Sequence, residues 1–210
     1  MDAEFWLDRW ATHQIGFHAD QPHPQLLAHF ARLGLAPGAP VFVPLCGKSH
    51  DLAWLRTAGH AVIGVELSPI AVAEFFGEHG IAPRRSVVGG LVCHEAPGYR
   101  LYQGDFFALD AAQLEHCAAI YDRAALIALP PAMRSDYAHH LTALVPPGAV
   151  MLLIAVGYDE ARVKPPPFVV DAAEIEALYG RDWSIQHLAT VDADVKGEPG
   201  TESIYLLRKR

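Results

Sequence analysis

Four short apolar runs, separated by segments with helical spacing, most constrain what this chain can fold into. The runs cover residues 41–44, 61–66, 118–122 and 149–156. Strands that alternate with helices in this way are typical of a parallel, doubly wound sheet. We therefore predict an α/β fold in which helices cover both faces of a mostly parallel sheet.

Helices and their boundaries follow from the spacing between the runs. Apolar residues at helical intervals predict helices over residues 49–57, 69–80, 131–144 and 171–179. Ser68 and Pro69 suit the N-cap and the first position of the second helix.

Antiparallel strands are expected at two further places. Two β-like runs over residues 91–103 predict a hairpin that ends in a core strand. Alternating runs over 183–190 and 203–207 predict a closing antiparallel pair, with its turn within 197–200. The proline-rich residues 164–168 predict a stiff loop between two elements.

Composition excludes several classes of function. The 210 residues, of which 51% are hydrophobic, suit one domain over residues 1–210. A net charge of -8 without a dense basic run disfavours nucleic acid, and no apolar run is long enough to span a membrane. The N-terminus has no signal-peptide core, and the three cysteines form no C-x-x-C pair. We expect a cytoplasmic protein without a metal site.

Residues 47–49 read GKS, which raises the question of a phosphate-binding loop. Such a loop needs a second glycine five positions earlier, because several successive N–H groups wrap the phosphate. Phe42 occupies that position within an apolar run. The sequence therefore predicts that this is not a P-loop.

The first two strand ends carry candidate ligand contacts, because such sheets bind ligands beyond the carboxyl ends of their strands. Gly47 lets a ligand approach the backbone closely, or else serves only a tight turn. Glu66 suits two hydrogen bonds from a ribose diol, although an acid near a helix N-terminus is also favoured by the helix dipole. The position of Glu66 at the end of the second strand favours the ribose contact over the helix-dipole role.

Two later strand ends add further candidates. Asp105 could accept a hydrogen bond from an adenine amino group while Phe106 packs on the ring, or it could simply cap a turn. Arg123 could pair with a carboxylate of a ligand, or with its neighbour Asp122.

These contacts suit a nucleoside cofactor without a phosphate grip. The loop PLCGKS has one glycine, whereas a dinucleotide fold requires G-x-G-x-x-G after its first strand. S-adenosylmethionine needs ribose and adenine contacts but no phosphate grip, and the closing antiparallel pair fits the seven-stranded sheet that binds it. The amphipathic residues 5–10, followed by IGFH at 15–18, predict either ordinary core packing or an N-terminal lid over residues 1–20.

Six segments together resemble the bacterial thiopurine S-methyltransferase family. They are FWLDRW, IGFH, VFVPLCGKSHDLAWL, GHAVIGVELS, GDFFAL and YDRAALIAL, in this order along the chain. The resemblance runs from about residue 5 to the end and includes PPF at 166–168. It implies a Rossmann-like, seven-stranded, monomeric S-adenosylmethionine-dependent enzyme that methylates thiopurines and other aromatic thiols. Some bacterial members are linked to methylation of selenium and tellurium compounds.

The resemblance also implies roles for particular residues. By this resemblance, S-adenosylmethionine is expected to contact Trp10, Leu45, Glu66 and Arg123. The lid region is expected to include Trp6 and Phe17. The family position of Asp105 and Phe106 borders the adenine, although human-type members carry serine where this chain has Asp105.

The expected mechanism is to hold the methyl donor and the sulfur acceptor in line, because the sulfonium is already a good methyl donor. The protein must align a sulfur nucleophile and exclude water. Arg123 is the expected catalytic residue, since its charge favours a thiolate or orients the donor. His18 is a second candidate, as a proton acceptor, and Trp10 and Phe17 suit stacking on a flat substrate and facing the sulfonium.

Three alternative functions stay open from the sequence. The first is methyl transfer to an inorganic acceptor such as halide, thiocyanate, or a selenium or tellurium oxyanion. The second is a nucleoside-binding module without turnover. The third is a nicotinamide oxidoreductase, which the missing glycine pattern disfavours.

Overall fold

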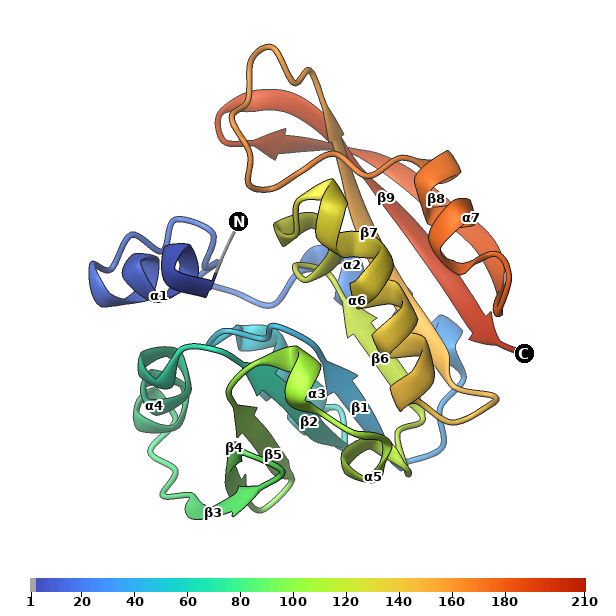
Figure 1. Cartoon of the computed structure of the whole chain (residues 1–210). Helices are drawn as coiled ribbons and strands as arrows, with labels where there is room; N and C mark the ends of the chain where they lie inside the picture. Colours follow the sequence, from blue (N-terminus) through green and yellow to red (C-terminus); the bar gives the residue numbers. More distant parts are fainter. Residues whose placement is uncertain (1–2) are drawn as a thin grey trace.

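A single mixed sheet forms the centre of the structure (Figure 1). The computed structural model describes residues 3–210, and within them nine strands lie in the order β3-β4-β5-β2-β1-β6-β7-β9-β8. The strands are β1 (Gly38–Val43), β2 (His60–Glu66), β3 (Arg84–Val88), β4 (Leu91–Ala96), β5 (Tyr99–Gln103), β6 (Ala119–Asp122), β7 (Val150–Tyr158), β8 (Trp183–Val195) and β9 (Glu198–Lys209).

Helices connect most of these strands. They are α1 (Ala3–Ala11), α2 (Pro24–His29), α3 (His50–Thr57), α4 (Pro69–Glu78), α5 (Ala111–Leu114), α6 (Pro131–Leu144) and α7 (Ala172–Tyr179). Three short 3-10 helices are η1 (Phe30–Leu33), η2 (Phe106–Ala108) and η3 (Leu126–Ala128).

The predicted seven-stranded architecture is confirmed within this sheet. Strands β5, β2, β1, β6 and β7 pair in parallel, and β9 and β8 close one side as the antiparallel pair. The two remaining strands, β3 and β4, extend the opposite edge in antiparallel fashion. The sequence carries no sign of β3, because all five of its residues are exposed and no alternation marks a buried face.

Helix N-termini follow local capping chemistry. The Ser49 hydroxyl accepts a hydrogen bond from the Asp51 N–H at 3.1 Å, and the Ser68 hydroxyl accepts one from the Ala71 N–H at 3.3 Å. These contacts fix where α3 and α4 begin, which is directly beyond β1 and β2. Sequence reasoning missed α2, whose N-cap is His23 rather than a usual capping residue.

The closing hairpin is longer than expected. The turn between β8 and β9 is formed by Lys196 and Gly197, which both have positive φ, at 58° and 84°. The prediction that residues 197–200 make the turn was therefore wrong for 198–200, which pair with β8 as part of β9. The carboxylate of Asp194 accepts a hydrogen bond from the Gly197 N–H at 2.7 Å and stabilises the tighter turn.

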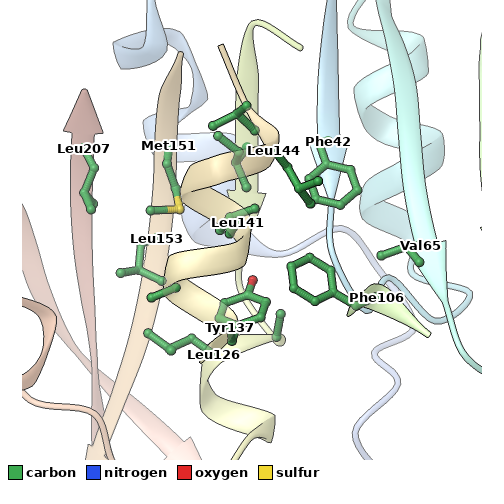
Figure 2. Close-up of a cluster of buried hydrophobic side chains, with 14 of the residues drawn as sticks. Phe42, Val65, Phe106, Leu126, Tyr137, Leu141, Leu144, Met151, Leu153 and Leu207 are labelled. Carbon is green, nitrogen blue, oxygen red and sulfur yellow. The ribbon is translucent and has the colours of Figure 1, made fainter. Parts of the chain in front are cut away.

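Two hydrophobic clusters lie on opposite faces of the sheet, as the prediction of helices on both faces requires. Figure 2 shows the first cluster, in which α6 packs over the sheet through Tyr137, Leu141 and Leu144 against Phe42, Met151 and Leu153. The second cluster joins α3 and α4 to the alternate strand residues, such as Leu152 and Ile154. Each fully buried side chain of this kind contributes about 1.5–3 kcal/mol to stability.

His94 makes the stability of the fold sensitive to pH. It lies in β4 with 4% of its surface exposed and stacks on Phe76 at 6.1 Å between ring centroids. Burial lowers the pKa of His94, although the Gln103 side chain partly opposes this shift. The unfolded chain therefore takes up a proton as the pH falls through about 6.5, while the folded chain does so only at a lower pH. This contribution to stability is complete above the unfolded pKa and is lost progressively as the pH falls from there to the folded pKa.

We predict that His94→Gln flattens the fall in melting temperature between pH 7.5 and pH 5. The exposed His139 on α6 provides the matched control, because His139→Gln changes the same side chain outside the core. Melting temperatures measured across this pH range, for wild type and both variants, check the prediction. The same slope in wild type and His94→Gln would contradict it.

Candidate functional site

The loop after β1 turns sharply at the carboxyl edge of the sheet. Leu45 and Gly47 both have positive φ, at 47° and 53°. Such a backbone costs a non-glycine residue about 1–3 kcal/mol, so surrounding contacts must hold it. One of them is the Cys46 N–H, which donates to the Val65 carbonyl of β2 at 3.0 Å. The loop is thereby tied to the end of the neighbouring strand.

The carboxylate of Glu66 joins this loop to the start of α4. Its Oε2 accepts a hydrogen bond from the Gly47 N–H at 2.8 Å, and its Oε1 accepts one from the Ser68 N–H at 2.7 Å. Burial raises the pKa of Glu66, and these N–H donors hold part of that rise back. Each oxygen has a further lone pair, so the carboxylate can still accept hydrogen bonds from two hydroxyl groups.

Lys48 of the GKS triplet is held by α4. Its Nζ lies 2.9 Å from Glu74 Oε2 and 2.6 Å from Glu78 Oε1. Burial opposes its charge, but hydrogen bonds to Glu74 and Glu78 outweigh that effect and raise the pKa of Lys48. The lysine therefore neutralises two carboxylates of α4 and does not project as a free phosphate ligand.

Asp122 and Arg123 differ in their contacts at the end of β6, because only Asp122 is paired within the described residues. Asp122 Oδ2 accepts from the Tyr137 hydroxyl at 2.6 Å, and its Oδ1 accepts from the Ala125 and Leu126 N–H groups. Within residues 3–210, the half-buried Arg123 has no hydrogen bond or ion pair. The pair between Asp122 and Arg123 that the sequence left open is not formed, so the guanidinium is available to a ligand.

Asp105 and Phe106 have separate surroundings after β5. Asp105 is exposed and caps η2, where its Oδ1 accepts from the Phe107 N–H at 3.0 Å. Phe106 is 6% exposed and packs against Tyr137 at 4.9 Å between ring centroids (Figure 2). Asp105 thus caps η2, and Phe106 belongs mainly to the core beneath it.

Trp10 connects the N-terminal segment to the glycine loop. A Cβ atom at Gly47 would lie 3.2 Å from the indole Cζ2 of Trp10, so the two residues are in direct contact. The Trp10 ring packs edge-on against Phe17, with 5.6 Å between ring centroids. Phe17 packs in the same way against Trp6, with 5.5 Å between ring centroids. Phe17 keeps 43% of its surface exposed, which leaves an aromatic ring facing outward from the segment.

His18 lies beside a second histidine, His50 of α3. Its ring stacks on His50 at 5.3 Å between centroids. Burial, and then the charges of Lys48 and His50, lower the pKa of His18. The lowered pKa keeps the His18 imidazole neutral near neutral pH, which is the form that can act as a general base.

One polar network at the base of the N-terminal segment was missed by sequence reasoning. Asp51 Oδ1 accepts from the His23 N–H at 2.7 Å, and its Oδ2 accepts from the Tyr121 hydroxyl at 3.1 Å. The His23 ring in turn meets Glu202 of β9 at 2.9 Å. The segment that leads from α1 into α2 is thereby fixed to α3, β6 and β9. The one sequence signal for this network was the position of Asp51 near the start of the helix predicted over residues 49–57.

The predicted site residues fall into two groups. Direct contacts bring together Trp10, Gly47, Glu66 and Phe17, and the Leu45 turn belongs to the same loop. Arg123 and Asp105 follow the carboxyl ends of β6 and β5, on the same edge of the sheet, without direct contact to Glu66. Within residues 3–210, no group of three or more His, Cys, Asp or Glu residues is arranged to hold a metal ion. No helix in that range is long and apolar enough to cross a membrane.

Gly47→Ala should destabilise the protein more than Gly80→Ala. Both glycines have left-handed backbone, with φ of 53° and 63°, so both substitutions cost about 1–2 kcal/mol for that reason. Only at Gly47 does the added methyl group meet Trp10, since nothing lies within 4 Å of a Cβ at Gly80. Urea unfolding of both variants checks the difference, and equal losses would show that Trp10 does not press on the loop.

Comparison with known proteins finds relatives that match the chain along its length. The thiopurine S-methyltransferase family matches residues 1–209. The thiopurine S-methyltransferase of Pseudomonas aeruginosa (strain UCBPP-PA14) is 46% identical over 219 aligned residues, which cover 100% of both chains. That of Azotobacter vinelandii is 48% identical over 192 residues, which cover 91% of this chain and 88% of the relative.

Solved structures share the fold. Magnesium protoporphyrin IX methyltransferase from Synechocystis PCC 6803, with bound SAH, superposes with a TM-score of 0.71 at 15% identity and covers 100% of both chains. At this identity the likeness concerns the arrangement of the sheet and its helices alone.

Proposed function

The chain belongs to the thiopurine S-methyltransferase family, and we propose that it moves the methyl group of S-adenosylmethionine to the sulfur of thiopurines or other aromatic and heterocyclic thiols. The full-length match at 46% identity is the observation that carries this proposal. The glycine loop and the acidic end of β2 support it, because they present hydrogen-bond acceptors where such folds bind a nucleoside.

Glu66 holds the ribose in this proposal. Both of its oxygens are already oriented by N–H donors, and each keeps one acceptor position for a ribose hydroxyl. Leu45 and Gly47 shape the loop beneath the donor, and Trp10 covers that loop. Asp105 accepts from the adenine amino group through its remaining carboxylate oxygen, with Phe106 supporting η2 from the core.

Arg123 is the proposed catalytic residue. When bound, S-adenosylmethionine supplies an electrophilic methyl group on a sulfonium, which needs no further activation. Arg123 has no partner of its own within residues 3–210, so its charge is free to hold the acceptor as a thiolate. His18, whose pKa is lowered by burial, takes up the proton of the thiol. Phe17 offers its exposed ring to a flat acceptor.

Residues 3–20 form a lid on a single domain in this proposal, and residues 1–2 of the predicted lid lie outside the described residues. Trp10 lies on Gly47, and the Trp6–Phe17 pair lies next to it, so the segment is positioned to exclude water from the reacting sulfur atoms. The protein acts as a monomer in the cytoplasm on a small thiol, without a nucleic-acid or membrane partner. The net charge of -8 supports the lack of a nucleic-acid partner.

Methyl transfer to a panel of acceptors tests the proposed function. The panel contains 6-mercaptopurine, thiophenol, iodide, selenite and tellurite, with S-adenosylmethionine as the donor and the methylated products identified by mass spectrometry. We expect turnover of the two thiols, because the aromatic rings of the lid favour flat organic acceptors. Turnover of the inorganic anions alone would contradict the proposed acceptor class.

Calorimetric titration with S-adenosylhomocysteine tests the assignment of Glu66. Glu66→Ala should weaken binding by about 1–3 kcal/mol, because two charge-assisted hydrogen bonds to the ribose are lost. Glu115→Ala, at an exposed acid beyond α5, is the control and should bind as the wild type does. Unchanged affinity in a folded Glu66→Ala variant would sink the ribose assignment.

A further inference from the structure

A buried arginine lies under the loop that joins β7 to α7, residues 159–171. Arg134 of α6 is 1% exposed. Its Nε donates to the Leu129 carbonyl at 3.0 Å, and its Nη1 donates to Glu174 Oε2 of α7 at 2.6 Å. A charge at this depth is costly unless it is paired, and apolar side chains often replace buried ion pairs without loss of stability. Packing alone therefore does not explain an arginine here.

The arginine contacts one particular residue of the loop. Its guanidinium carbon lies 5.6 Å from the ring centroid of Phe168. The Phe168 N–H donates to the Ile127 carbonyl of η3 at 2.7 Å, and the Tyr158 hydroxyl donates to the Pro167 carbonyl. Residues 167 and 168 are thus fixed from α6, from η3 and from the end of β7.

These contacts place Phe168 on the same edge of the sheet as Arg123. Ile127, to which Phe168 is bound, lies in η3, the first turn of chain after Arg123. Figure 1 shows the loop passing over the N-terminal end of α6, where Arg134 is located. The half-buried Phe168 is therefore bound through its backbone to the chain segment that follows the unpartnered guanidinium.

We propose that Arg134 is a positioning residue for the methyl acceptor, which it serves by holding Phe168 and Pro167 as a fixed wall beside Arg123. This inference rests on the proposed function, since the wall has an occupant only if the chain methylates a small thiol. Arg134 acts through Phe168 and does not touch the donor. A planar guanidinium is required, because it binds Glu174 and lies against the ring at the same time, whereas a lysine ammonium cannot do both.

Three variants and one control test this role. Arg134→Met removes the charge and the hydrogen bonds, and Arg134→Lys keeps only the charge. Phe168→Leu removes the ring while α6 and its ion pair stay intact. Arg162→Met is the matched control, because Arg162 belongs to the same loop but is 63% exposed and pairs on the outside with Glu198 at 3.1 Å.

Each protein is measured in three ways. Steady-state kinetics use 6-mercaptopurine as the varied acceptor at saturating S-adenosylmethionine. Calorimetry gives the affinity for S-adenosylhomocysteine. Amide hydrogen exchange follows the peptide over residues 163–170, which reports on the Phe168 N–H without any need for turnover.

Both Arg134 variants and Phe168→Leu should raise the KM for the acceptor about tenfold, since small misplacement of a substrate-positioning group is costly. The affinity for S-adenosylhomocysteine should stay within about twofold of the wild type, because none of these residues contacts the donor in the proposed site. The Arg134 variants should also exchange the 163–170 amides faster, and Arg162→Met should match the wild type throughout.

Several results would overturn the inference. A wild-type acceptor KM in a folded Arg134→Met protein would do so, as would an equal rise in KM for Arg162→Met. If Arg134→Met does not fold, a wild-type KM in Phe168→Leu overturns the inference in its place. A wild type that binds no S-adenosylhomocysteine and methylates no thiol would instead overturn the proposed function, and the role of Arg134 with it.

Discussion

The two hydrogen bonds accepted by the buried Glu66 carboxylate are the interaction on which the site depends. One comes from Gly47 in the loop after β1 and the other from Ser68 at the start of α4, at 2.8 and 2.7 Å. A single side chain thereby fixes the relative positions of two strand-to-helix connections. Burial of this carboxylate is unfavourable, as its raised pKa indicates, and the N–H donors offset part of that cost. The acceptor positions that remain are the ones a ribose would use in the proposed site.

The N-terminal segment is built directly onto this loop. Trp10 touches Gly47, while Lys48 of the same loop binds Glu74 and Glu78 of α4. Beyond burial, the charge of that lysine also lowers the pKa of His18, which couples the proposed lid electrostatically to the loop and to α4. The network of His23 and Asp51 fixes the other end of the segment. Binding of a nucleoside in the loop and closure of the segment over it are therefore expected to support one another.

Sequence reasoning succeeded where periodicity or capping chemistry was strong. Helix α6 has the predicted bounds of Pro131–Leu144, and Ser68 caps α4 as expected, because both signals are local in the chain. Strand β3 was missed since its residues are exposed on both faces, and α2 was missed since His23 is an unusual N-cap. The positions of Glu66 and Arg123 at strand ends could be predicted from the order of elements. Contacts such as Trp10 with Gly47, or Arg134 with Phe168, depend on tertiary packing, and spacing alone does not encode them.

A structure of the protein bound to S-adenosylhomocysteine would show whether Glu66 holds the ribose. We expect both ribose hydroxyls to donate to Glu66, at about 2.5–3.0 Å between oxygens, while the Gly47 and Ser68 N–H groups keep their bonds to the same carboxylate. Trp10 should remain in contact with Gly47 and cover the bound nucleoside. A ribose bound away from Glu66, or a Glu66 carboxylate that keeps only its two backbone partners, would show that Glu66 does not hold the cofactor.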